Sequence, residues 1–277
     1  VAVATIDGAR RDSTRRNHTA THLLHAALRT VLGDHVRQQG SLVEPDRLRF
    51  DFAHTSGLAP EEIDAVLTMV NGDVVENDSV ETVDASRQEA EAMGAVAFFG
   101  DKYGDRVRVV RAGAHSLEFC GGTHVHRLGD IGQIQVVSEA SIGSNTRRLE
   151  AVTGLGAVRR SREMELVLAS VASTLKASQE EVIPSLERLV DKQRETEKAL
   201  TALRQASLSS QAASLVSSAV EGVLVQRIDG TSVDELRTLA QDLRQRGIRH
   251  VMLAGDAGDG KVAMAIATDG SVDAKGI

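Results

Sequence analysis

The sequence predicts an α+β protein in which a mixed N-terminal block is followed by a long helical, coiled-coil-like segment and then by part of a small α/β domain. Strand and helix patterns are interspersed up to about residue 155, without a regular βαβ repeat. Glycine is then absent between residues 157 and 220, where Ala, Glu, Arg, Leu and Ser dominate. Strand patterns return after Gly222. We therefore expect domains at 1–155, 156–221 and 222–277.

Composition restricts the class of protein. A single cysteine in 277 residues excludes an internal disulfide and favours a reducing, cytoplasmic compartment. No apolar run reaches the length of about 18 residues that a membrane span needs. The net charge of −7 argues against a generally basic nucleic-acid-binding surface. The chain has no initiator Met and no clear final element, so we expect a fragment of a longer polypeptide.

The first expected helix covers residues 17–32. Asn17 is a suitable N-cap, and Gly33 stands where a glycine stop is expected. His18 and His22 are four residues apart and therefore share one face of this helix. His25 lies a further turn away, and we interpret it as a structural residue or a partner of a ligand.

Alternating runs and turn signals place the remaining elements. Strands are expected at 35–43, 48–52, 79–83, 106–111, 116–119, 131–137, 146–152, 223–227, 250–254 and 262–267, and helices at 60–71, 87–93 and 232–246.

The helical segment is expected to form an antiparallel pair. Ser178 with Glu181 fits a capping box, and Pro184 predicts a break. An apolar seam should pack the helices together; it consists of Leu186, Leu189, Val190, Leu200 and Leu203.

Two short motifs predict one metal site. His18 and His22 form one pair, and Cys120 and His124 form a second pair around a Gly-Gly turn. Zinc binds nitrogen and sulfur ligands tetrahedrally, so the two pairs supply a full set of four. The alternative is two unrelated pairs with Cys120 as a buried core thiol. Four protein ligands are typical of a closed site, so a catalytic zinc needs a ligand to move aside or the ion to expand its coordination; otherwise zinc only positions the substrate and neighbouring groups activate the water. Cys120 as a nucleophile paired with His124 is a weaker alternative.

Other motifs are rejected or left as surface features. Residues 255–261 fit G-x4-G-K, but Val262 replaces the Ser or Thr that a phosphate loop needs, and we interpret the stretch as a hairpin turn. Four arginine doublets begin at Arg10, Arg15, Arg147 and Arg159. Taken alone, each doublet is interpreted as a solvated surface pair rather than as a phosphate clamp.

The motifs also resemble a known family. Residues 16–29, 39–43 and 48–52, with 118–125 and 147–154, resemble the editing domain of bacterial alanyl-tRNA synthetases, and the rest of the chain looks like their C-terminal region. This resemblance implies a proofreading hydrolase that cleaves the ester of serine or glycine wrongly attached to tRNA(Ala). ATP and Mg²⁺ would serve only an aminoacylation domain that this chain lacks.

The resemblance also implies roles for individual residues. His18, His22, Cys120 and His124 correspond to zinc ligands, one Zn²⁺ per chain. Thr21, Gln38 and Ser41 correspond to the amino-acid pocket, where polar groups can select serine over alanine. Arg147 and Arg148 become candidates for binding tRNA phosphates. The C-terminal region implies tRNA binding and a homodimer.

Three alternatives remain open. A free-standing editing deacylase shares the zinc motifs, but the helical tail and the final α/β block count against it. The editing domain of threonyl-tRNA synthetases has the same pairs of ligands without such a C-terminal region. The third alternative is a zinc-stabilised module that binds tRNA or dimerises without catalysis.

Overall fold

The computed structural model describes residues 2–97, 104–256 and 262–271, and the chain forms two compact units. The first unit runs to Ser170 and the second starts at Val171. The mixed α+β class predicted from the sequence is confirmed, with helices and three β-sheets in the described residues. None of the described helices contains a stretch that is both long and apolar enough to cross a membrane.

The first helix, α1 (Gly8–Leu32), is longer than predicted. It ends at Gly33 as expected, but it begins nine residues before residue 17 because the carboxylate of Asp7 caps it by accepting from the Arg10 backbone N–H. The prediction that Asn17 is the N-cap was therefore wrong. Asn17 is buried inside α1, where its amide donates to the Glu44 carbonyl and accepts from the Thr153 hydroxyl.

A four-stranded antiparallel sheet supports α1. Its strands are β1 (Gln38–Val43), β2 (Leu48–Ala53), β7 (Thr146–Thr153) and β6 (Ile134–Gly143), in that order. Helix α2 (Pro60–Glu76) packs beside α1, and both helices share the main core with the sheet. Phe50, Leu149 and Leu24 are fully buried in this core. The alternation predicted at residues 48–52 thus places one face of β2 against α1.

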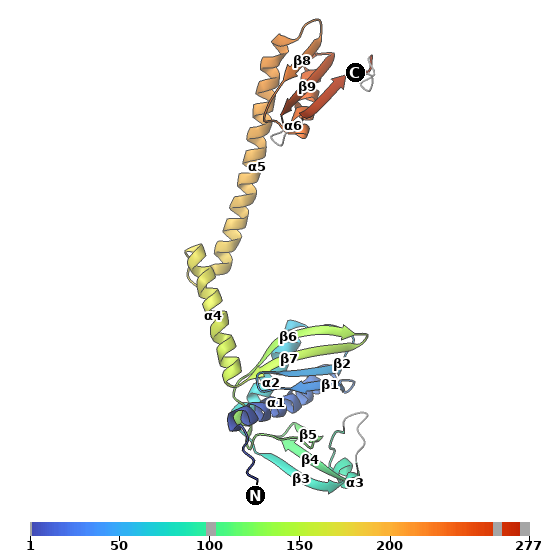
Figure 1. Ribbon diagram of the computed structural model, residues 1–277, viewed down its shortest axis with the longest axis vertical. Coiled ribbons are helices and arrows are strands. Elements are labelled where there is room, and N and C mark those ends of the chain that lie inside the picture. Colours follow the sequence, from blue (N-terminus) through green and yellow to red (C-terminus); the bar gives the residue numbers. More distant parts are fainter. Residues whose placement is uncertain (1, 98–103, 257–261, 272–277) are drawn as a thin grey trace. The chain divides into compact units, whose positions relative to one another are not determined.

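A second antiparallel sheet carries the other predicted ligand pair. It consists of β3 (Val80–Ser86), β4 (Arg106–Ala112) and β5 (Ser116–Phe119), and the short helix α3 (Arg87–Ala92) packs on β3 and β4. A 3-10 turn, η1 (Leu128–Ile131), then leads to β6. The loop after β5 begins at Cys120 and lies against α1. Figure 1 shows this sheet next to α1 and apart from the four-stranded sheet.

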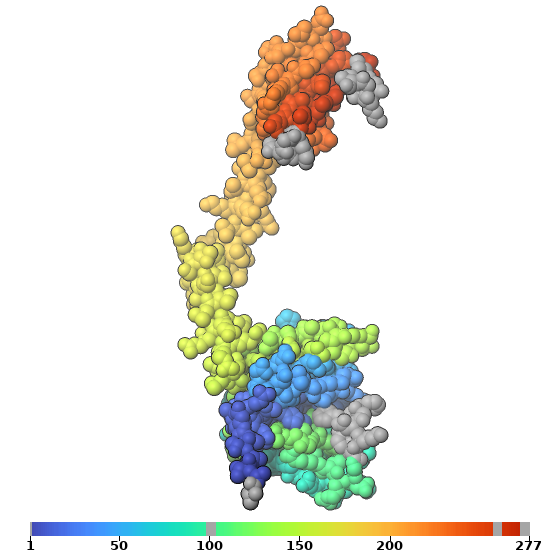
Figure 2. All heavy atoms as spheres, in the orientation of Figure 1, coloured from blue at the N-terminus to red at the C-terminus, as the bar shows by residue number. Residues whose placement is uncertain are grey.

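The helical segment forms α4 (Leu155–Leu175) and α5 (Val182–Leu215). The break lies at residues 176–181 rather than at Pro184, which stands in the first turn of α5, where proline costs no backbone hydrogen bond. The predicted capping box was also wrong, because Glu181 itself is the N-cap and accepts no side-chain cap bond. The predicted seam residues of α5 are exposed, and Figure 2 shows the first half of α5 with side chains standing out from the helix. The antiparallel pairing stays a prediction.

The second unit contains a small α/β fold. Strands β8 (Val223–Arg227) and β9 (His250–Asp256) are parallel and joined through α6 (Val233–Gln245), while β10 (Val262–Thr268) pairs antiparallel with β9. A short 3-10 turn, η2 (Val216–Ser218), follows α5. One face of the sheet packs on α5 and α6.

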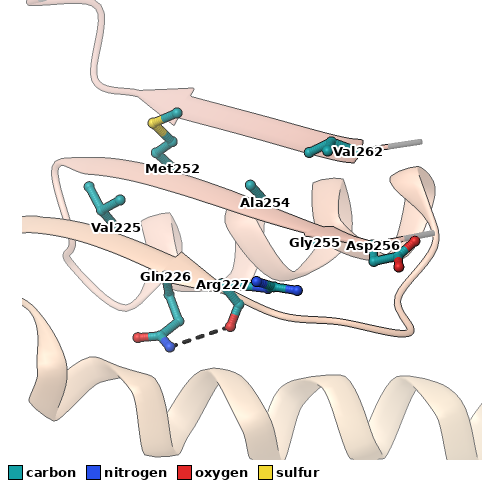
Figure 3. A pocket seen from close by; sticks show the side chains of 8 residues that line it. All are labelled: Val225, Gln226, Arg227, Met252, Ala254, Gly255, Asp256 and Val262. Atoms are coloured by element: carbon teal, nitrogen blue, oxygen red, sulfur yellow. Dashed lines mark hydrogen bonds between the residues drawn. The ribbon is translucent and has the colours of Figure 1, made fainter. Parts of the chain in front are cut away.

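The opposite face of this sheet is open and holds a shallow hollow of about 450 Å³, lined by Val225, Met252, Val262 and their neighbours (Figure 3). The stretch 255–261 lies mostly outside the described residues. The strands that flank it are antiparallel neighbours, whereas a phosphate loop would lead into a helix.

Candidate metal centre

Four side chains from two distant parts of the first unit converge. His18 and His22 project from α1, and Cys120 and His124 belong to the loop after β5. One ligand atom from each lies within 4.8 Å of the other three. We call this group the His/Cys cluster. The spacing of the two motifs predicted this convergence, and it occurs because the loop packs on the helix face that carries the histidines.

The cluster has dimensions that suit a metal ion. The Cys120 Sγ atom lies 3.4 Å from His18 Nε2 and 3.3 Å from His124 Nε2. Zinc–sulfur and zinc–nitrogen bond lengths place the corners of a tetrahedral site about 3.5 Å apart. Nitrogen and thiolate donors are also those that zinc prefers. The residues present therefore fit one zinc ion.

Each imidazole of the cluster is oriented through its Nδ1 atom. In His18 this atom lies 3.2 Å from the Thr123 carbonyl oxygen, to which it can only donate. In His124 it lies 3.1 Å from the Thr19 hydroxyl, which also bonds the Arg15 carbonyl oxygen. In His22 it bonds the Glu118 carboxylate. A hydrogen bond at Nδ1 leaves Nε2 as the metal donor and fixes the ring, as is common around protein-bound metals.

Glu118 is the site residue that sequence analysis missed. Its buried carboxylate accepts from His22 through one oxygen and from His25 through the other, the second at 2.6 Å. His25 therefore lies outside the cluster and holds Glu118, which agrees with its expected structural role. The sequence does carry one signal for this role. Glu118 is an acidic residue inside the short strand predicted at 116–119, two residues before Cys120, and such a residue needs a partner when it is buried.

Burial and mutual charge set the ionisation of these groups in the absence of metal. Burial opposes the charged form of Glu118, but His22 and His25 outweigh it and lower its pKa to about 2. Burial likewise opposes ionisation of Cys120, but hydrogen bonds from the cluster histidines lower its pKa to about 3. Burial opposes protonation of His22, yet Glu118 and Cys120 raise its pKa to about 10. Cys120 is thus held as a thiolate, the form that binds metals.

The two glycines of the Gly-Gly turn differ in the space around them. A Cβ atom on Gly122 would overlap the His18 ring, whereas one on Gly121 would meet open space. Neither glycine has a positive φ. The guanidinium of Arg108 also supports the turn, because it donates to the carbonyl oxygens of Gly122 and Cys120. Gly122 therefore allows α1 and the loop to approach closely.

The three predicted pocket residues lie apart from this bonding network. Thr21 is buried in α1, and its hydroxyl donates to the Asn17 carbonyl. Gln38 is half-buried at the start of β1, where its Nε2 lies 3.3 Å from the hydroxyl of the exposed Ser41. A register shift follows Gln38, and such bulges often redirect side chains beside functional sites. None of the three is hydrogen-bonded to the cluster among the described residues, so their role stays a prediction.

The two arginines predicted to bind phosphate are already paired. Arg147 donates to both carboxylate oxygens of Glu139, and Arg148 donates to both oxygens of Asp51 at 2.7 and 2.8 Å. These pairs join neighbouring strands of the four-stranded sheet. Each guanidinium has its charge balanced within the protein. Their role in tRNA binding stays a prediction.

Comparison with known proteins places this region in a family context. Residues 107–150, which include Cys120 and His124, match the family model described as "Threonyl and Alanyl tRNA synthetase second additional domain". The chain is 45% identical over 275 residues to an alanine–tRNA ligase of Xanthomonas campestris, covering 98% of this chain and 31% of that protein.

Two further relatives align over a similar share of each chain. The identity is 42% over 278 residues to an alanine–tRNA ligase of Acetivibrio thermocellus, covering 99% of this chain and 32% of the relative. It is 45% over 276 residues to one of Chlorobaculum tepidum, covering 97% and 31%. The chain therefore spans about a third of the length of the curated relatives that it matches.

Proposed function

Since this chain is homologous over nearly its whole length to one third of the alanine–tRNA ligases and carries the second additional domain of threonyl and alanyl tRNA synthetases, we propose that it is their proofreading part. It would hydrolyse the ester of serine or glycine wrongly attached to tRNA(Ala). The observation that carries the proposal is the His/Cys cluster, half of which lies inside the matched domain and half on α1.

We propose that the cluster holds one Zn²⁺, with His18, His22, Cys120 and His124 as ligands. A bound zinc ion supplies a Lewis acid and a fixed anchor for substrate oxygen or nitrogen atoms. The protein contributes the orientation of the ligands. Glu118 accepts from His22, and Thr19 holds His124, so both rings are fixed before substrate arrives. Four protein ligands are typical of a closed site, so a direct contact of zinc with the substrate would require one ligand to move aside or the ion to add a ligand.

We propose that Thr21, Gln38 and Ser41 select which amino acid is released from the tRNA. Serine differs from alanine by one hydroxyl, which an apolar pocket rejects poorly but a hydrogen-bonding pocket recognises well. Gln38 donates through Nε2 to Ser41, and its Oε1 has no partner among the described residues. We propose that Oε1 accepts the hydroxyl of a bound serine. An alanine methyl group at this place would leave the amide oxygen unpaired.

The remaining parts are assigned by relation to the longer relatives. We propose that ATP and Mg²⁺ act in the aminoacylation domain of the parent enzyme. We propose that residues 156–221 are a helical linker after an editing domain at 1–155. Residues 222–277 would form the start of a region that binds tRNA and supports a homodimer.

The test is a deacylation assay with tRNA(Ala) charged in parallel with serine, glycine or alanine. We expect release of serine at least about tenfold faster than release of alanine, because a polar pocket discriminates a hydroxyl by about that factor or more. We also expect glycine to be released faster than alanine, but glycine has no hydroxyl, so hydrogen bonding by Gln38 does not explain that preference. Release of none of the three, with zinc bound and tRNA still bound, would favour the non-catalytic binding module instead.

A further inference from the structure

A polar pocket adjoins the His/Cys cluster and is not used by the proposed chemistry. Its volume is about 340 Å³, and we call it the α1 pocket; it is lined by Asp12, Arg15, Arg16, Val125, His126 and Asp130. Arg15 and Arg16 lie within three residues of His18 on α1, and Val125 and His126 directly follow His124. These lining residues are therefore within one turn of α1 of His18 or next in sequence to His124.

The arginines of the α1 pocket have free hydrogen-bond donors. Arg15 pairs with Asp12 at 3.0 Å through Nη1, while its Nε is shielded from water without a partner among the described residues. Arg16 donates through Nε to the Asp130 carbonyl oxygen at 2.9 Å, and no described residue accepts from its two Nη atoms. A donor that is shielded from water and has no partner destabilises the folded protein. An oxygen acceptor that bonds to it would remove this cost.

The pocket lies in the most basic stretch of the described α1 surface. Residues 8–16 contain four arginines and one aspartate in a chain whose net charge is −7. By contrast, Arg147 and Arg148 are each bound by both oxygens of a carboxylate. The two arginines on α1 therefore keep N–H donors without a partner among the described residues, and neither is held by both oxygens of a carboxylate.

The two acids of the pocket do not make it a cation site. Asp12 already pairs with Arg15, and one Asp130 carboxylate oxygen accepts from the Arg127 backbone N–H. Arginines with planar, free N–H groups are instead suited to phosphate oxygens.

We propose that the α1 pocket binds the phosphodiester backbone at the 3′ end of the RNA whose terminal ester lies at the cluster. This inference rests on the proposed function for the identity of the RNA. A phosphate held by Arg15 and Arg16 fixes the last nucleotides one turn of α1 away from His18, and so places the ester without any contact to a base. Binding there is insensitive to sequence, because phosphate contacts position a nucleic acid and do not read it.

The first experiment measures binding of uncharged tRNA(Ala) to the zinc-loaded 277-residue chain by fluorescence anisotropy at several salt concentrations. We expect Arg15→Gln with Arg16→Gln to weaken binding about tenfold and to reduce the slope of log K against log salt by about 1 to 2, since two phosphate contacts are lost. The matched control is Arg159→Gln with Arg162→Gln, which removes the same charge from exposed positions of α4. Equal binding by both double variants would overturn the proposal.

A charge-keeping variant separates binding from folding. Arg15→Lys with Arg16→Lys retains two cations, so it should restore the slope of log K against log salt that the glutamine variant loses. If the lysine variant has the same reduced salt slope as the glutamine variant while zinc content stays at one per chain, the two arginines act structurally and the proposal fails.

The second experiment compares two small substrates, the seryl ester of adenosine and that of a cytidylyl-cytidylyl-adenosine trinucleotide. The proposal predicts that the glutamine variant hydrolyses the phosphate-free ester like wild type but is about tenfold slower on the trinucleotide. An equal effect on both esters would contradict it. Failure of wild type on both esters and on charged tRNA would reject the proposed function, while the anisotropy result would still decide whether the α1 pocket binds RNA.

Discussion

At the scale of single residues, the cluster depends on one acid that binds no metal itself. Glu118 is buried between His22 and His25 and holds the first through a charge-assisted hydrogen bond. Carboxylates in this position fix the histidine ring and increase its basicity. The ring of His22 would therefore be poorly ordered without Glu118.

Replacing Glu118 by Gln should weaken zinc binding by about 10- to 100-fold, the usual effect of losing such a partner. Competition with a chelator of known affinity measures this change. Glu76→Gln is the matched control, because Glu76 is exposed at the end of α2 and makes no side-chain hydrogen bond among the described residues. Unchanged zinc affinity in Glu118→Gln would show that the ring of His22 is held by other contacts.

Gln38 carries the second residue-scale prediction. Gln38→Ala should slow release of serine from tRNA(Ala) about tenfold or more and leave tRNA binding nearly unchanged, since only the serine hydroxyl loses a partner. Ser41→Ala is the comparison, because it removes the group that Gln38 Nε2 contacts while keeping Oε1. Equal loss of serine release and of tRNA binding in Gln38→Ala would mean that Gln38 is structural.

Residue types and spacing identified the four residues of the cluster, but not the residues that hold them in place. His18, His22, Cys120 and His124 are metal-binding residue types in two recognisable pairs. Glu118 and Arg108 act through tertiary contacts that no local pattern encodes. The pairing of Arg147 with Glu139 depends likewise on the register of two strands, which a single sequence does not specify.

At the scale of elements, the site is a contact between a helix and a turn. The Cys120–His124 turn lies so close to α1 that only glycine fits at position 122. Thr19 on α1 also accepts from the backbone N–H of Val125, which fixes the end of the turn. The metal ligands are thus brought together by direct packing of the turn on α1.

Gly122→Ala tests this packing. The added methyl group must displace the His18 ring, so we expect zinc affinity to fall at least about tenfold, by analogy with the strain of overpacked sites. Gly121→Ala is the matched control, since its methyl group would meet open space and should leave zinc affinity unchanged. Isothermal titration of the metal-free proteins measures both. Two variants that bind zinc equally well would show that the turn can move away from α1.

Most elements were predictable from local patterns, and the errors have local causes. Alternation located β2 and β7 well, and the helix expected at 232–246 is α6, for which Ser232 is the N-cap. The start of α1 was misplaced because Asn17 is a good cap by residue type but is used to bond Glu44 and Thr153. The break before α5 was misplaced because Pro184 is tolerated in the first turn of a helix.

At the scale of the whole molecule, the chain combines a unit that holds the cluster with a separate unit built on α5 and a small mixed sheet. The chain covers about a third of its alanine–tRNA ligase relatives, in which the same order of sequence is embedded in a longer protein. The exposed seam on α5 and the open face of the β8–β9–β10 sheet were not foreseen, because a sequence pattern shows that a face is apolar but not what covers it.

The proposed function requires that the His/Cys cluster is a zinc site on which hydrolysis depends. The most direct measurement titrates the metal-free chain with Zn²⁺ while following release of serine from mischarged tRNA(Ala). We predict that serine release rises with added zinc and saturates at one ion per chain, and that Cys120→Ala with His124→Ala neither binds the ion nor releases serine. Full serine release by the metal-free chain, or a full zinc load in the double variant, would contradict the claim.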